Sequence, residues 1–103
     1  MNEDKTNLGK AKVNEETSQI AWKDLQRFFA GGTIIYVAPE LDLVDVAFQM
    51  SIDNKAQVEQ WLKTRQIAKV SDQQALTWYE TDAEVWAVVV KPWILVQDAH
   101  RVQ

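Results

Sequence analysis

The side chains able to act as nucleophiles, bases or metal ligands are few in this chain. The sequence contains no cysteine and one histidine, His100, which lies beside Arg101 close to the C-terminus. A protein zinc site draws on several cysteine and histidine ligands, and a general base must reach the reacting group within the fold. We therefore expect neither a metal site nor histidine catalysis, and Ser71 is expected to cap a helix instead of attacking a substrate.

Carboxylates and tyrosines are the remaining groups with acid or base chemistry. Asp42 and Asp45 are spaced as neighbours on one helix face, where solvated carboxylates with a capping role are common. Asp82 and Glu84 fall in a predicted turn, and both tyrosines are expected to contribute packing. No catalytic constellation is visible, so the sequence predicts a protein that is not an enzyme and needs no cofactor. A small-ligand binder that uses these groups stays open as an alternative.

A cluster of cations raises the alternative of a nucleic-acid-binding module of the winged-helix type. The order helix, strand, two helices resembles that fold, and the cations lie on or after the third predicted helix. The net charge of −4 and the sequence pI near 4.9 oppose binding to phosphate backbones. The candidate nucleic-acid residues under this alternative are Lys55, Lys63, Arg65 and Lys69.

Length and composition indicate one globular domain. The chain has 103 residues, of which 47% are hydrophobic and 25% charged, close to the averages of globular domains. The longest uninterrupted apolar run, Val85 to Val90, is far shorter than the ~20 residues needed to cross a bilayer. The N-terminus lacks the pattern of a secretory signal, so we expect a cytoplasmic protein without membrane contact.

The chain divides into two tails and one domain. Residues 1–13 are polar and are predicted to form a flexible tail, residues 14–97 the domain, and residues 98–103 a C-terminal tail. Asn14 is the predicted N-cap of a helix that ends at Gly31-Gly32, since glycine favours the left-handed conformation after a helix C-terminus.

The elements of the domain alternate between helices and strands. Thr33 to Ala38 reads as a buried strand, and Ile67 to Val70 as a short strand or a connector. Capping residues at Asp42, Asn54 and Ser71 start three further helices. The pattern predicts an α+β fold in which about four helices cover a small mixed sheet of about three strands.

The stretch Val85 to Val96 is apolar in both alternation classes, which predicts a strand covered on both faces. A tight hairpin at Lys91-Pro92 is disfavoured because two-residue turns require a positive φ at the first loop position. We therefore expect one strand kinked at Pro92, and two separate strands remain the open alternative. In an unbroken strand, Trp86 and Trp93 belong to opposite alternation classes.

Association is the function that the sequence favours. A kinked strand can pair within the molecule or leave the sheet to pair with another subunit, and tryptophan is common among the residues that dominate interfaces. For the stretch itself an internal core is the first interpretation, and burial of Trp93 to Val96 at a dimer contact is the alternative. We predict a homo-oligomer, most simply a dimer, with the candidate interface residues Trp86, Lys91, Pro92, Trp93 and Leu95.

Several segments together resemble a bacterial family of proteins of unknown function, numbered 2288. These are IAWKDLQRFFAGG, LDLVDVA, QVEQWL and VSDQQALTWYETDAEVWAVVVKPWILVQ, with the ending VKPWILVQ as the most specific. The resemblance covers about residues 15–97. It implies a bacterial, cytoplasmic, single-domain protein, and it brings no activity, cofactor or catalytic residue with it.

Overall fold

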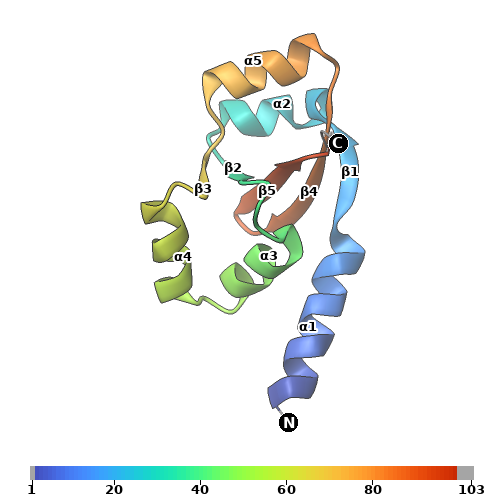
Figure 1. Ribbon diagram of the computed structural model, residues 1–103. Coiled ribbons are helices and arrows are strands. Elements are labelled where there is room, and N and C mark those ends of the chain that lie inside the picture. Colours follow the sequence, from blue (N-terminus) through green and yellow to red (C-terminus); the bar gives the residue numbers. More distant parts are fainter. Residues whose placement is uncertain (1, 100–103) are drawn as a thin grey trace.

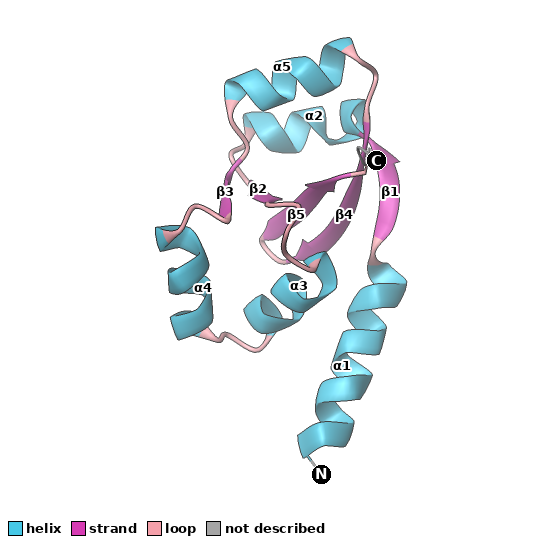
Figure 2. Ribbon diagram, viewed as in Figure 1, coloured by secondary structure: helices cyan, strands magenta, loops and turns pink. Residues whose placement is uncertain are grey.

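Strands form one mixed sheet at the centre of the protein, and helices pack around it (Figures 1 and 2). The structure, a computed structural model, describes residues 2–99, with side chains from Gly9 onward. The described helices are α1 (Asn2–Glu16), α2 (Trp22–Ala30), α3 (Leu43–Ser51), α4 (Lys55–Lys63) and α5 (Asp72–Glu80). The described strands are β1 (Ser18–Ala21), β2 (Ile34–Val37), β3 (Ile67–Lys69), β4 (Glu84–Val90) and β5 (Trp93–Asp98).

The α+β class and the single domain are confirmed, whereas the predicted numbers of elements were too low. The described part of the chain has five helices and a five-stranded sheet, instead of about four and three. Residues 67–69 form a strand and are not merely a connector. Asp98 ends β5, so the C-terminal strand reaches into the segment predicted as a tail, and His100 lies outside the described residues.

The strand order places β5 at the centre of the sheet. The order is β1-β4-β5-β2-β3, with β2 and β5 parallel and the other neighbours antiparallel. Leu95 is paired with Val88 of β4 on one side and with Ile35 of β2 on the other. Both edges of β5 are therefore occupied within the molecule, and this strand cannot leave the sheet to pair with another subunit.

Helices cover both faces of the sheet, as the apolar alternation predicted. On one face α2 and α5 enclose a core that contains Trp22, Trp78, Val85 and Val96. On the other face α1, α3 and α4 enclose a core that contains Val46, Phe48, Trp61 and Leu95. The side chains of Leu95 and Val96 are fully buried, one toward each face, so β5 contributes to both cores.

The tryptophans of α2, α4 and α5 are buried in the two cores. Trp22, Trp61 and Trp78 are 0%, 7% and 6% exposed. The rings of Trp22 and Trp78 are 5.0 Å apart between centroids and tilted by 56°, within the range for favourable aromatic pairs. The indole Nε1 of Trp22 has no hydrogen-bond partner among the described residues, so apolar packing in this core stabilises its position.

The predicted kink at Pro92 was wrong, because the chain reverses there in a tight hairpin. Val90 pairs with Trp93, and only Lys91 and Pro92 lie between the two strands. The Lys91-Pro92 peptide bond is cis, and Lys91 is not among the residues with positive φ. The chain therefore reverses without the positive φ that was expected of a two-residue turn.

The hairpin also corrects the predicted separation of Trp86 and Trp93. Paired residues of neighbouring strands point to the same face, and the pairs Trp86–Gln97 and Val90–Trp93 belong to one alternation class. Both tryptophans are half-buried and pack against the core under α3 and α4. They lie on the same face of the sheet, at different heights along the hairpin.

Local signals for helix ends are confirmed where side chains cap the helix. The carboxylate of Asp42 accepts a hydrogen bond from the Val44 backbone N–H at 3.0 Å. Ser71 forms the full predicted capping box at the start of α5. At the end of α2, Gly32 has a φ of 76°, as the glycine pair indicated.

The start of the domain differs from the prediction. Asn14 lies inside α1 and caps no helix. The single helix predicted from Asn14 to Gly31-Gly32 is interrupted by β1, which separates α1 from α2. β1 exists because Ile20 pairs with Val85 on the edge of β4, a contact far away in sequence. Residues 2–13, which were predicted to belong to a flexible tail, form part of α1.

A close approach between helices docks α1 on α3, although α1 lacks an apolar face. A methyl group built on Gly9 would lie 2.6 Å from Cε1 of Phe48, so only glycine allows this approach without displacing the ring. Nearby, Lys10 Nζ lies 3.2 Å from the Asp45 carboxylate, and Val13 is buried in the core. Packing against α3 stabilises a helix that its own residue pattern would not.

A single polar side chain within the core holds the loop between β2 and α3. Gln97 of β5 is 9% exposed, and its Nε2 donates to the carbonyl oxygens of Ala38 at 2.9 Å and Leu41 at 2.8 Å. The Leu41 carbonyl thereby gains a partner, and the Ala38 carbonyl, which also accepts from the Leu41 backbone N–H at 3.0 Å, gains a second one. β5 thus positions α3 through hydrogen bonds as well as through packing.

We predict that Gly9→Ala weakens the docking of α1. Helix propensity alone would stabilise α1 by about 1 kcal/mol, but the new methyl group must displace the Phe48 ring. Chemical denaturation of Gly9→Ala, Phe48→Leu and the double variant measures the coupling between the two positions. The expected coupling is favourable, with the double variant more stable than the sum predicts. A full gain of stability from Gly9→Ala alone would contradict the contact.

Gln97→Met is expected to lower the free energy of unfolding by about 1–3 kcal/mol, because it removes the side-chain donor to the Leu41 carbonyl and one of the two donors to the Ala38 carbonyl. Methionine has a similar length, which separates the loss of hydrogen bonds from the loss of volume. Urea denaturation measures the change. Hydrogen exchange should locate the loosening in the loop between β2 and α3, and unchanged stability would show that water replaces the amide at no cost.

Candidate functional site

A groove lies beside the hairpin turn, between the end of the β4–β5 hairpin and the helices α3 and α4. Its volume is about 340 Å³, enough to accept a large side chain of a partner or a small ligand. Its apolar residues come from α3, α4 and both strands, and its charged residues include two acids and two lysines. The lining residues of this hairpin-end groove are Met50, Asp53, Lys55, Val58, Glu59, Val90, Lys91 and Trp93.

The structure divides the predicted interface residues into two groups. Lys91 and Trp93 line the hairpin-end groove, and the exposed Pro92 lies between them. Leu95 is fully buried in the central strand, so no partner can reach it in the folded protomer. Trp86 is half-buried further along β4 and does not line the groove.

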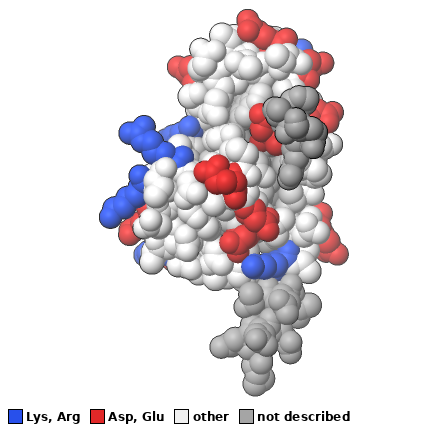
Figure 3. Space-filling model, in the orientation of Figure 1, with Lys and Arg blue, Asp and Glu red and all other residues white. Residues whose placement is uncertain are grey.

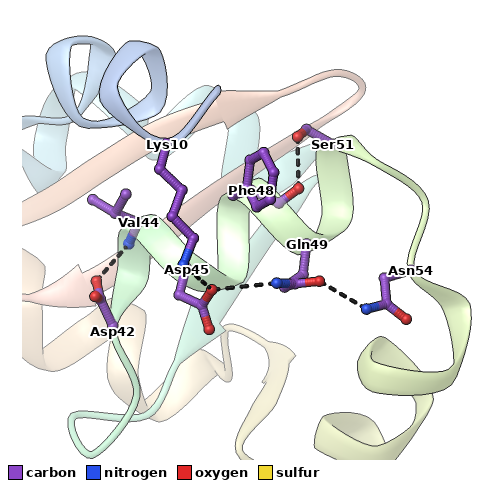
Figure 4. Close-up of polar contacts among 8 residues, drawn as sticks. All are labelled: Lys10, Asp42, Val44, Asp45, Phe48, Gln49, Ser51 and Asn54. Atoms are coloured by element: carbon purple, nitrogen blue, oxygen red, sulfur yellow. Dashed lines mark hydrogen bonds and ion pairs between the residues drawn. The ribbon is translucent and has the colours of Figure 1, made fainter. Parts of the chain in front are cut away.

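Polar contacts link the groove to the rest of the fold (Figure 4). Along α3, Gln49 Nε2 donates to Asp45 Oδ1 at 3.4 Å, and Asn54 Nδ2 donates to Gln49 Oε1 at 2.7 Å. Asn54 also accepts from the Gln57 backbone N–H at 3.3 Å, which caps α4. Because Asn54 stands between Asp53 and Lys55 in the sequence, this chain of contacts helps to position two of the four charged residues of the groove.

The sequence carried no signal for the helical side of this groove. Met50 and Val58 belong to two separate helices, and no motif relates them, Asp53 or Glu59 to the hairpin. The groove arises because the turn at Lys91-Pro92 ends level with the loop between α3 and α4, which no spacing in the sequence reveals.

The candidate nucleic-acid residues lie along α4 and at the β3 edge of the sheet. Lys55 begins α4 and lines the hairpin-end groove, whereas Lys63 ends α4, Arg65 follows in the turn and Lys69 ends β3. Figure 3 shows most basic side chains of this face gathered on the side of α4 and β3. Along the sequence, helix α5 follows β3 and precedes β4, so the order of helices and strands differs from that of a winged helix.

The acids and tyrosines considered for catalysis have separate surroundings. Asp45 is paired with Lys10, and Asp82 with Lys23 at 3.4 Å. Tyr79 is exposed on α5, with Lys23 Nζ 5.0 Å from its ring centroid. Tyr36 lies under α5 instead, 6.0 Å from the Trp78 ring centroid, so the structure does not bring the two tyrosines into one site.

Burial changes the acid chemistry of Tyr36. Loss of solvent raises the pKa of its phenol above 10.0, and the negative charges of Asp98 and Glu40 raise it further. The folded protein therefore binds the phenolic proton more tightly than the unfolded chain does. Tyr36 is consequently a neutral packing residue at physiological pH.

A second, wider hollow lies at the other end of the sheet. It has a volume of about 610 Å³ and is lined by residues of α5 and by strand residues that include Gln19, Glu84 and Asp98. Among the described residues, no cluster of three or more His, Cys, Asp or Glu side chains is arranged to hold a metal ion. No helix in residues 2–99 has the length and apolarity to cross a membrane.

The raised pKa of Tyr36 predicts a loss of stability at alkaline pH. The stabilisation from the neutral phenol is fully present below pH 10 and is lost as the pH rises through the higher folded pKa. Urea denaturation between about pH 8 and pH 11 should show a smaller decline for Tyr36→Phe than for the wild type. Identical declines would show that other groups control the alkaline transition.

Comparison with solved structures finds a protein of the same fold. The solution NMR structure of PA1075 from Pseudomonas aeruginosa is 40% identical and superposes with a TM-score of 0.79. The match covers 88% of this chain and 84% of PA1075. No curated protein matches this chain.

The family comparison agrees with the resemblance noted in the sequence. The model of the family described as "Protein of unknown function (DUF2288)" matches residues 9–98, which include the hairpin, both helical layers and the second half of α1. The chain belongs to this family of proteins of unknown function.

Proposed function

We propose that this protein is not an enzyme and acts by association, binding a second copy of itself through the hairpin-end groove. The observation that carries the proposal is the half-buried indole of Trp93, which lines the groove next to the exposed Lys91 and Pro92. Tryptophan side chains in partly enclosed pockets are frequent among the residues that dominate binding energy.

An exposed apolar side chain beside the groove supports this surface. Ile52 is 55% exposed and precedes Asp53, which lines the groove. A single exposed apolar residue is ordinary, but one next to a groove with an apolar lining enlarges the surface that association would bury.

The charges at the groove favour a second copy as the partner. Asp53 and Glu59 provide two acids, and Lys55 and Lys91 provide two lysines. In a two-fold contact each copy presents the same surface, so a set with equal numbers of both signs can be complementary to itself. A partner of strong net charge would gain little from such a surface.

The placement of the acids supports a binding function over catalysis. Asp42 caps α3, and Asp45 and Asp82 each form an ion pair with a lysine. Each of these carboxylates has a local structural role, and they lie apart from the groove in which Trp93 is found.

Sedimentation equilibrium on Trp93→Ala, with Trp86→Ala as the matched control, tests the proposal. Both tryptophans are half-buried against the same core, but only Trp93 lines the groove. Trp93→Ala should raise the dimer Kd about thirty-fold, the equivalent of about 2 kcal/mol, whereas Trp86→Ala should change it little. Circular dichroism confirms that both variants remain folded.

Two outcomes would overturn the proposal. A wild-type protein that stays monomeric up to millimolar concentration has no such association. If Trp86→Ala and Trp93→Ala weaken the dimer equally, the effect comes from the shared core and the groove is not the contact.

A further inference from the structure

The outer edge of β1 carries backbone groups that no other strand of the described sheet pairs. β1 is the first strand in the order β1-β4-β5-β2-β3, with β4 as its one neighbour. The Trp22 backbone N–H donates to the Ala83 carbonyl at 2.9 Å, which sets the phase of the ladder with β4. Hydrogen-bonded pairs alternate along antiparallel strands, so Ser18 and Ile20 bond to β4. Gln19 therefore directs its N–H and C=O groups away from the sheet, and Ala21 directs its N–H away from it. The Ala21 carbonyl, at the N-cap of α2, accepts the first hydrogen bond of that helix.

This edge lacks the features that protect sheet edges. Proteins block exposed edges with charged side chains, proline, bulges or very short strands, because unpaired backbone groups invite another strand. At the opposite edge, β3 has three residues and ends in Lys69. The four residues of β1, Ser-Gln-Ile-Ala, contain neither a charge nor a proline. The edge at β3 therefore carries a charged residue, whereas the edge at β1 carries neither a charge nor a proline.

We propose that β1 pairs antiparallel with β1 of a second copy, about a two-fold axis that passes beside Ile20. In this register Gln19 faces Ala21 of the other copy and Ala21 faces its Gln19. The Ala21 N–H donates to the Gln19 carbonyl of the other copy, and the Gln19 N–H becomes a second donor to the other copy's Ala21 carbonyl, since a carbonyl oxygen has two lone pairs. A register centred on Gln19 would need the backbone N–H of Thr17, which already donates to the Asn14 carbonyl at 3.2 Å. A register centred on Ala21 would need Lys23, which belongs to α2.

A second copy is the occupant that this edge fits. The strand is uncharged, so two copies meet without repulsion between like charges, and the pairing is complementary to itself under a two-fold axis. The surface is independent of the hairpin-end groove, because β1 pairs with residues 84–87 of β4 and the groove begins at Val90. With both surfaces occupied, the assembly is larger than a dimer.

Disulfide trapping tests this register in a chain that has no natural cysteine. In the proposed pairing the two Ile20 side chains are direct neighbours, with Cβ atoms roughly 4.5–5.5 Å apart, close enough for a disulfide after a small adjustment. The matched control is Ser18→Cys, on the same strand and face but more exposed. The two Ser18 positions would be offset by four residues, or about 14 Å, too far for a disulfide.

Under mild oxidation, Ile20→Cys should form a covalent dimer at least tenfold faster than Ser18→Cys. Random collision predicts the opposite order, because Ser18 is the more accessible residue. Adding Gln19→Pro should abolish trapping, since proline removes an outward N–H without touching the ladder to β4, whereas Gln19→Ala should not. Circular dichroism of each variant verifies the fold.

Equal or faster trapping of Ser18→Cys, or no trapping of a folded Ile20→Cys, would overturn the proposal. Repeating the trapping in the Trp93→Ala background separates the two surfaces. Ile20→Cys should still cross-link there, even if association through the hairpin-end groove proves absent. Loss of trapping in that background would contradict an independent edge contact.

Discussion

The central position of β5 is the constraint on which the rest of the structure depends. Because β5 lies between β4 and β2 and is covered on both faces, its side chains must be apolar in both alternation classes. Leu95 and Val96 complete the two cores, and the amide of Gln97 holds the loop that leads to α3. The hairpin turn therefore lies at the end of the sheet, beside the loop between α3 and α4.

This constraint also determines which surfaces remain for association. A strand paired on both sides has no backbone groups to offer, so a partner must use the end of the hairpin or the edge of another strand. The end of the hairpin exposes Lys91 and Pro92 and half-exposes Trp93. The uncharged edge lies at β1, at the other end of the strand order from the protected edge of β3. The two proposed contacts therefore follow from the strand order.

Local signals explain what the sequence could predict. Helix caps at Asp42, Asn54 and Ser71, and the turn at Gly31-Gly32, depend on residues a few positions apart, and each is found in the structure. The burial of the helical tryptophans follows from periodicity in the same way. Of the candidate site, the sequence could indicate the turn residues and Trp93, because an apolar strand broken by proline is visible locally.

The missed features depend on contacts that are distant in sequence. β1 is a strand because Ile20 meets Val85, and α1 is held because Gly9 allows Phe48 to approach closely. The hairpin turn was missed because the chain reverses at Lys91 without the positive φ that was expected of a two-residue turn. The helical side of the groove was invisible because no local pattern relates Met50 and Val58 to the hairpin.

Amide hydrogen exchange on the dilute protein is the measurement that tests the central position of β5 most directly. A strand paired on both sides has neighbours for all its backbone amides, so the amides of Ile94 to Val96 should exchange slowly and without alternation. Under the same conditions the outward amides of Gln19 and Ala21 should exchange rapidly. Alternating fast and slow amides along β5 would show that this strand has a free edge and would contradict the account.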